Sequence, residues 1–235
     1  MLEMLGKRAL VIAAHPDDEV LGCGGTIALL GDSGVEVHIA LLTDGVGSRE
    51  SFAMHANQSD HQLSRRQAAN NAAKILGARS VFFGDFPDNR MDTIALIDIV
   101  KFIEQLIVRF QPNTVFTHHA GDLNVDHRLT NQAVLTACRP IPGAPVQTVL
   151  FFEIPSSTEW QVPASAISFA PNFFLETTDQ MGRRQTALEA YAEEIRPWPH
   201  SRSYEALNHL SRWRGATVGV DAAEAFMLGR KLVRV

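Results

Sequence analysis

Short apolar segments alternate along the chain with longer amphipathic ones. The apolar segments are rich in Val, Ile and Phe and have the length of strands that are buried on both faces of a parallel sheet; they span residues 8–14, 35–42, 80–83, 113–117 and 147–153. Apolar residues recur at helical spacing in the segments between them, over residues 19–30, 60–76, 93–110 and 126–138. This alternation predicts an α/β fold, a Rossmann-like three-layer sandwich with a mostly parallel sheet.

The rest of the chain is less regular. Residues 43–59 and 155–174 show little periodicity, and loops of that length in a compact domain usually carry function or shape a pocket. Helical spacing returns over residues 178–194 and 203–230. A chain of 235 residues can enclose one substantial core. We therefore expect a single domain over residues 1–235, with a helical C-terminal part from about residue 176.

Composition and charge exclude several classes of protein. The formal net charge is −5 and the basic residues are scattered, which argues against a sequence-independent grip on nucleic acid. Two cysteines, Cys23 and Cys138, provide neither a disulfide framework nor a sulfur-rich zinc site. No apolar run approaches the roughly 18 residues of a membrane span, and no signal peptide is evident, so we expect a cytoplasmic protein.

The densest group of chemically active residues is His15-Pro16-Asp17-Asp18-Glu19, directly after the first predicted strand. Open parallel sheets bind ligands at the carboxyl ends of their strands. If a helix begins here, His15 and Asp18 are three residues apart and can point at one ion, with Asp17 beside them. Proline and acidic residues are also ordinary at the start of a helix, so this motif alone leaves both interpretations open.

A second group, THHAGDLNVDHR, follows the fourth predicted strand and again precedes a helix. Because parallel strands end at the same edge of a sheet, His127 can supply a third ligand beside His15 and Asp18. Two histidines and one carboxylate leave the fourth position of a tetrahedral zinc ion open for water, which is the arrangement of catalytic zinc sites. Fe²⁺ is the alternative ion for the same donors.

These stretches resemble the GlcNAc-phosphatidylinositol de-N-acetylase family (PIG-L), also called the LmbE-like proteins. The resemblance covers most of the chain and is carried by AHPDDE, RRQAANNAAKILG, FPD, the histidine-bearing loop and RGATVGVDAAEAF. It implies that His15, Asp18 and His127 bind zinc. It also implies that Asp17 is the general base; spacing alone leaves open which of the two aspartates is the ligand. Zinc lowers the pKa of its bound water to about 7, and a neighbouring carboxylate can take the proton as the water attacks an amide carbonyl.

The sequence departs from the family pattern at Asn124, where members commonly carry a histidine that stabilises the oxyanion or protonates the leaving amine. Asparagine can donate a hydrogen bond to an oxyanion but cannot shuttle a proton at neutral pH. His118 or His119 from the same loop is the replacement that we expect. Asp126 either orients such a histidine or caps the following helix, and the sequence favours neither.

The resemblance implies removal of an acetyl group from an amino-sugar conjugate of the N-acetylglucosamine type. Arg65, Arg66 and Asp88 loosely match family positions near the sugar. Arginines suit phosphate and carboxylate groups, so Arg196, Arg202, Arg212 and Arg214 would fit an anionic group attached to the sugar. The sequence is also compatible with a homo-oligomer. The three tryptophans are expected in the core, the more frequent use of that residue.

Two alternatives stay open. A zinc amidase of this kind can act on a different acyl amide, because the ion does not specify which carbonyl it polarises. A non-catalytic nucleotide-binding module can use the same Rossmann-like frame, although the chain lacks both GxGxxG after the first strand and GxxxxGK.

Overall fold

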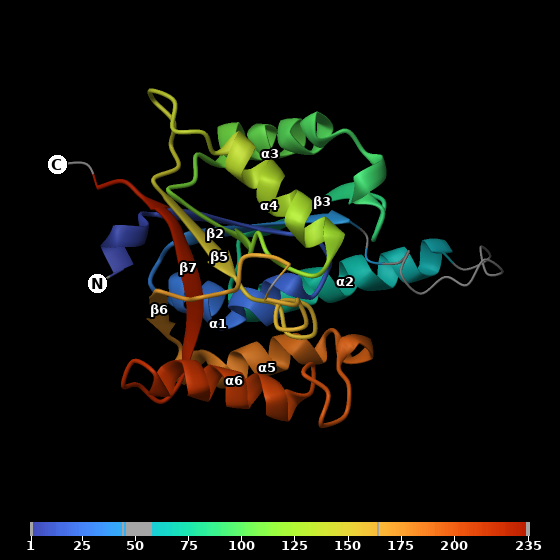
Figure 1. Ribbon diagram of the computed structural model, residues 1–235, viewed down its shortest axis with the longest axis vertical. Coiled ribbons are helices and arrows are strands. Elements are labelled where there is room, and N and C mark those ends of the chain that lie inside the picture. The colour runs from blue at the N-terminus through green and yellow to red at the C-terminus, as the bar shows by residue number, and fades with distance from the viewer. Residues whose placement is uncertain (1, 44, 46–57, 164, 234–235) are drawn as a thin grey trace.

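One sheet of seven strands organises the part of the chain that the computed structural model describes, residues 2–43, 45, 58–163 and 165–233. Helices α3 (Leu96–Phe110) and α4 (Val125–Ala137) cover one face of this sheet, and α1 (Asp18–Asp32) and α2 (Gln58–Leu76) cover the other (Figure 1). Helices α5 (Met181–Glu189) and α6 (Tyr204–Ala216) lie outside the second layer, with α5 packed against both α1 and α2.

The strand order is β3-β2-β1-β4-β5-β7-β6. The bounds are β1 Arg8–Ala13, β2 Glu36–Thr43, β3 Ser80–Phe86, β4 Thr114–His118, β5 Thr148–Phe152, β6 Phe173–Glu176 and β7 Ala223–Lys231. Strands β1 to β5 are parallel, whereas β7 runs antiparallel to β5 and β6. The chain order reverses between β1 and β4, which is the topological switch point where such sheets bind ligands. The predicted α/β class with a mostly parallel sheet is confirmed.

The remaining elements are short or C-terminal: α5 Met181–Glu189, α6 Tyr204–Ala216, and the 3-10 turns η1 Leu2–Leu5, η4 Met91–Thr93, η5 Thr178–Gln180 and η6 Ala192–Glu194. The four helices between the parallel strands begin and end within a few residues of their predicted positions. The largest difference is at α3, because residues 91–93 form the separate turn η4. Most of the predicted loop over residues 43–59 lies outside the described residues.

The core consists of two apolar clusters, one on each face of the sheet. Residues 9–13 of β1 are fully buried and face both clusters alternately, as expected for a central parallel strand. Gly22 brings α1 against β5, because a Cβ at this position would lie 2.5 Å from the ring of Phe152. This close approach fixes the start of α1 over the carboxyl ends of the strands.

Two predictions about the C-terminal part are wrong. Residues 223–230 were expected to be helical, but together with Lys231 they form β7, which pairs with the edge of β5. Ala, Glu, Met, Leu and Lys in this segment favour a helix, and pairing with an existing strand edge overrides that preference. Strand β6 likewise lies at the end of a stretch that was expected to be irregular throughout.

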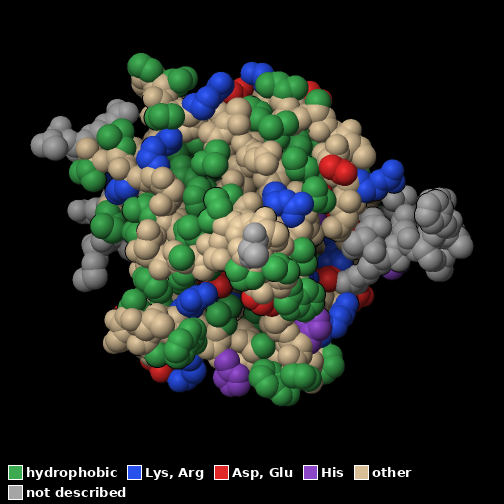
Figure 2. All heavy atoms as spheres, in the orientation of Figure 1, with side chains coloured by type: hydrophobic (Ala, Val, Ile, Leu, Met, Phe, Trp, Pro, Cys, Tyr) green, Lys and Arg blue, Asp and Glu red, His purple; other side chains and the backbone are tan. Residues whose placement is uncertain are grey.

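Basic side chains and tryptophans at the surface bear on the predictions made from composition. Basic side chains are scattered over the face in Figure 2 rather than gathered into one patch. The tryptophans are exposed, Trp160 by 54%, Trp198 by 57% and Trp213 by 65%, so their expected place in the core is wrong. Within the described residues, no helix has both the length and the apolar character that a membrane span needs.

Candidate metal centre

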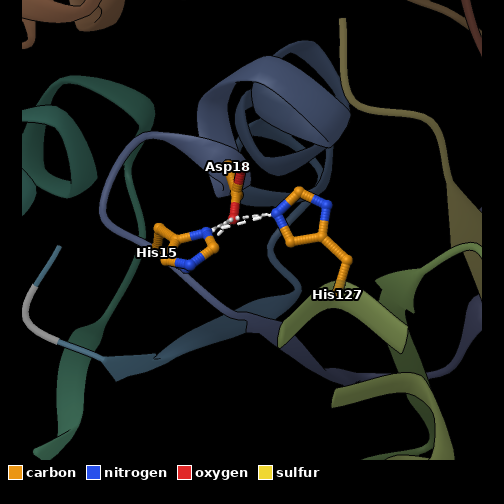
Figure 3. Close-up of side chains that lie close together, drawn as sticks. All are labelled: His15, Asp18 and His127. Atoms are coloured by element: carbon orange, nitrogen blue, oxygen red, sulfur yellow. Dashed lines mark hydrogen bonds and ion pairs between the residues drawn. The ribbon is translucent and has the colours of Figure 1, made fainter. Parts of the chain in front are cut away.

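Three side chains converge at the switch point of the sheet (Figure 3). His15 follows the end of β1, Asp18 is the first residue of α1, and His127 lies in the first turn of α4, which follows β4. These elements are far apart in the sequence, and the neighbouring positions of β1 and β4 bring them together. The structure therefore assembles the trio that the sequence predicted.

The distances within this trio fit a single ion. Asp18 Oδ2 lies 3.1 Å from His15 Nδ1 and 3.2 Å from His127 Nε2, and the two nitrogens are 3.2 Å apart. Ligand atoms at about 2.0–2.1 Å from a tetrahedral zinc ion are about 3.3 Å from one another. The second oxygen of Asp18 is buried and has no hydrogen-bond partner among the described residues. The donor set and its spacing thus suit a divalent transition metal.

Carboxylates behind both histidines fix the orientation of the rings. His15 Nε2 lies 3.1 Å from Asp126 and 3.2 Å from Asp88, and His127 Nδ1 lies 3.0 Å from Asp122. Metal-binding histidines usually donate their outer N–H to such a group, which selects the tautomer and strengthens the ligand.

Asp122 is itself held by its neighbours. It accepts hydrogen bonds from the Thr158 hydroxyl at 2.5 Å, from the Asn124 backbone N–H at 2.9 Å and from the Ser157 hydroxyl. The outer carboxylate behind His127 is therefore fixed on several sides.

The electrostatics of the trio favour a cation. Burial opposes the charged form of His15, but hydrogen bonds to Asp126 and Asp18 outweigh it and raise the pKa of His15 well above its usual value. The pKa of His127 is raised in the same way against burial, chiefly by Asp18 and Asp122. Burial would raise the pKa of Asp18, but the charge and hydrogen bond of His127 lower it well below the usual range.

Asp17 lies beside the trio, at the turn into α1. Its backbone has φ 117°, which is unusual for a residue with a side chain, and its N–H donates to Glu19 Oε2 at 3.1 Å. Glu19 is fixed in turn by the Tyr191 hydroxyl at 2.7 Å. Burial raises the pKa of Asp17, with Arg202 acting in the opposite direction, and burial raises the pKa of Glu19 to about 8.

A cavity of about 130 Å³ opens beside the trio. Its lining is mostly polar and comprises His15, Pro16, Asp17, Gly45, Arg65, Asp88, Asn89, Asn124, His127, Ser156, Ser157, Glu194 and Arg202. This volume accommodates a small group such as an acetamide, so that the rest of a larger substrate would extend outside it.

The two other histidines of the loop do not reach this cavity. His118 accepts the Ala14 backbone N–H at 2.8 Å on Nε2 and stacks on His127, with 3.9 Å between ring centroids. Burial and the nearby charge of His127 lower the pKa of His118 well below its usual value. His119 Nε2 is hydrogen-bonded to the Ile167 carbonyl at 2.7 Å. Neither residue lines the cavity, so the structure does not bring either of them to the place expected of the missing acid.

Asn124, and not Asp126, caps α4. Asn124 caps α4 by accepting the Asp126 backbone N–H at 2.8 Å, and it also lines the cavity. Asp126 accepts the backbone N–H groups of Asn89 and Met91 at 2.7 and 3.1 Å and orients His15. Asp126 therefore orients a histidine, but a different one from those proposed, and it does not cap the helix.

Two of the three candidate substrate residues lie at the cavity and one does not. Arg65 lines the cavity and pairs with Glu194, and Asp88 lines it beside His15. Arg66 pairs with Asp85 at the surface and stacks over Phe83, and it does not line the cavity with the other two candidates.

Comparison with known proteins identifies the family of the chain. A family model described as PIG-L: GlcNAc-PI de-N-acetylase matches residues 10–138. The chain belongs to this family. The expected family is confirmed, and with it the expected class of enzyme, a hydrolase of carbon–nitrogen bonds other than peptide bonds.

The proteins to which the chain is similar differ in what their names describe. The uncharacterized deacetylase YaiS of Escherichia coli is 32% identical over 173 residues, 72% of this chain and 80% of that protein. A probable N-acetyl-alpha-D-glucosaminyl L-malate deacetylase 2 of Bacillus cereus is 28% identical over 138 residues, 58% of this chain and 63% of that protein. The structure of GalB, the 4-carboxy-2-hydroxymuconate hydratase from Pseudomonas putida, has 27% identity and a TM-score of 0.76, covering 97% of this chain and 98% of that chain.

Proposed function

We propose that the protein is a zinc-dependent de-N-acetylase that acts on an N-acetylated amino-sugar conjugate. The observation that carries this proposal is the spacing of 3.1–3.2 Å among donor atoms of His15, Asp18 and His127, with Asp17 beside them at the cavity. Membership of the family and the name of the Bacillus relative support the sugar. Fe²⁺ is the alternative ion, since the same donors bind it.

The residues of the chain take the following roles. His15, Asp18 and His127 would hold the metal, which when bound activates water and polarises the amide carbonyl. The Asp17 carboxylate accepts the proton of the attacking water and returns it to the leaving amine. The Asn124 amide, whose Nδ2 donates to Asn89 at 3.1 Å, has a further N–H with which to stabilise the developing oxyanion.

Acetate release from a panel of N-acetylglucosamine conjugates, neutral and anionic, tests the proposal. Wild-type protein loaded with zinc should release acetate from at least one conjugate. Asp17→Asn should keep the metal and lose about 10²–10⁴-fold in turnover, the usual contribution of a general base. Asp221→Asn, in a surface pair with Arg212, is the matched control and should keep full turnover. Undiminished turnover in Asp17→Asn would remove Asp17 from the mechanism.

A hydratase is the second candidate. The specific observation is the cavity, which has Asn124 where family members commonly carry a proton-shuttling histidine and has Arg65 and Arg202 in its lining. Arginines suit the carboxylates of an unsaturated polycarboxylic acid. Incubation with such acids separates the two candidates, because hydration of the conjugated double bond lowers the ultraviolet absorbance of the acid. Hydration of an acid, with no release of acetate from any N-acetylated conjugate, would replace the deacetylase proposal. Release of longer acyl groups in preference to acetate would indicate the amidase alternative.

A further inference from the structure

Arg202 forms a direct ion pair with Asp17. Its Nη1 lies 2.8 Å from Asp17 Oδ2, and Asp17 is only 3% exposed. Arg202 comes from the segment between η6 and α6, more than 60 residues beyond the part of the chain that the family model matches. A charged hydrogen bond of this length to a buried carboxylate restricts its rotation.

The Arg202 side chain is itself fixed. Its Nε donates to the Ser156 hydroxyl at 2.7 Å, and its backbone N–H donates to His200 Nδ1 at 3.0 Å. The next residue, Ser203, caps α6 by accepting the Ala206 N–H at 3.0 Å. Arg202 is thus anchored by the loop after β5 and by the start of α6, rather than free to follow a substrate.

The pair continues into a row of alternating charge along the cavity wall. Arg202 Nη1 lies 3.9 Å from Glu194, and Glu194 pairs with Arg65 of α2. All of these side chains line the cavity. Asp17 therefore faces a fixed guanidinium on one side and the metal ligands on the other.

We infer that Arg202 is a positioning residue for Asp17: it holds the carboxylate of the general base in one orientation at the cavity and balances its charge. The role as a partner of the base rests on the proposed function, whereas the buried pair stands independently of it. The C-terminal part of the chain thereby contributes to a site whose proposed metal ligands all lie between residues 15 and 127.

Thermal unfolding tests the pair without any assay of activity. The variants are Arg202→Met, Asp17→Asn and the double variant, each measured as zinc-loaded protein with its metal content. Arg202→Met leaves a buried carboxylate unpaired and should lower Tm by about 5–10 °C, and adding Asp17→Asn should recover part of that loss. If the changes in Tm of the two single variants simply add up to that of the double variant, Asp17 and Arg202 are not coupled and the inference is overturned.

Kinetics test the positioning role. Arg202→Met should lower kcat about 100-fold, the effect of a small misplacement of a reacting group, while KM changes less than about twofold and metal content is unchanged. Added guanidinium should restore part of kcat in Arg202→Ala. Arg183→Met, which removes a surface arginine paired with Asp32, is the matched control and should change neither constant.

The outcomes separate the two claims. A rise in KM with kcat unchanged would make Arg202 a substrate-binding residue and overturn the inference. Coupled unfolding without turnover of any N-acetylated substrate would refute the proposed function and leave the pair intact.

Discussion

The proposed metal ligands His15 and His127 each have carboxylates on the side of the ring that faces away from the ion site. Asp126 and Asp88 stand behind His15, and Asp122 stands behind His127, so each ring is held from both ends. This arrangement orients each ring before an ion arrives, which lowers the rearrangement that binding requires. The affinity of the site for a metal is therefore expected to depend on residues that are not themselves ligands.

Asp122→Asn tests this view. The substitution preserves shape but removes the negative charge opposite His127 Nδ1, and should weaken zinc affinity about 10–100-fold, as the loss of such partners usually does. Competition with a chromogenic chelator measures the affinity. Asp32→Asn, a surface carboxylate that pairs with Arg183, serves as the control and should bind zinc like wild type. Equal affinity in both variants would show that Asp122 does not support His127.

The sequence predicted the three side chains that converge here but only some of their partners. His15, Asp18 and His127 were predictable because each lies next to the carboxyl end of a predicted strand and because the family resemblance singled out Asp18 rather than Asp17. Asp122 belongs to the same loop, but no spacing rule ties it to His127 rather than to the helix start. Arg202 lies in the stretch RPWPHSRS, which has no regular spacing, and only the packed chain shows that it reaches Asp17.

Among the elements, α1 is the one whose packing positions the site. Asp17 and Asp18 stand at its start, and Gly22 and Gly25 allow it to approach β5 and the segment around Thr177. Glu224 of β7 accepts the backbone N–H groups of Gly25 and Thr26 at 2.8 and 2.7 Å. The N-terminal helix is therefore held by the C-terminal strand.

Gly22→Ala should destabilise the protein by about 1–3 kcal/mol, since the added methyl group meets the Phe152 ring in a packed core. Gly182→Ala is a matched control in α5, where a Cβ meets nothing within 4 Å, and it should stabilise by about 0.4–1 kcal/mol. Urea unfolding measures both. A stabilised Gly22→Ala would show that α1 does not pack on β5 as closely as described.

Helices and strands were predictable to different degrees. The parallel strands and the helices between them follow from burial on both faces and from helical periodicity, which are local properties of the sequence. Strand β7 does not, because it has helix-forming residues and becomes a strand only by pairing with β5 and β6. Prediction failed where long-range pairing, rather than local preference, decides the structure.

For the whole molecule, β7 links the parallel half of the sheet to the C-terminal helices. Phe226 at its centre is fully buried, pairs across the strands with Phe152 and Phe173, and has its ring 5.4 Å from that of Phe116. Residues from both halves thus share one cluster, which leads us to propose that the chain unfolds as a single unit.

Phe226→Ala should therefore lower the free energy of unfolding by about 3–5 kcal/mol while leaving one cooperative transition. Leu228→Ala, in the same strand but 37% exposed, is the control and should have a much smaller effect. All three tryptophans lie beyond β5, so tryptophan fluorescence reports on that part of the chain, and its curve should coincide with the circular dichroism of the whole chain. Two separated transitions would contradict a single domain.

The metal content of purified protein tests the central claim most directly. Wild-type protein should carry close to one equivalent of a transition metal, as measured by inductively coupled plasma mass spectrometry. His127→Ala should lose this metal. His209→Ala, which removes an exposed histidine, is the control and should keep the metal. A folded His127→Ala protein that retains a full equivalent, or a wild-type protein that binds none when offered zinc, would contradict the account.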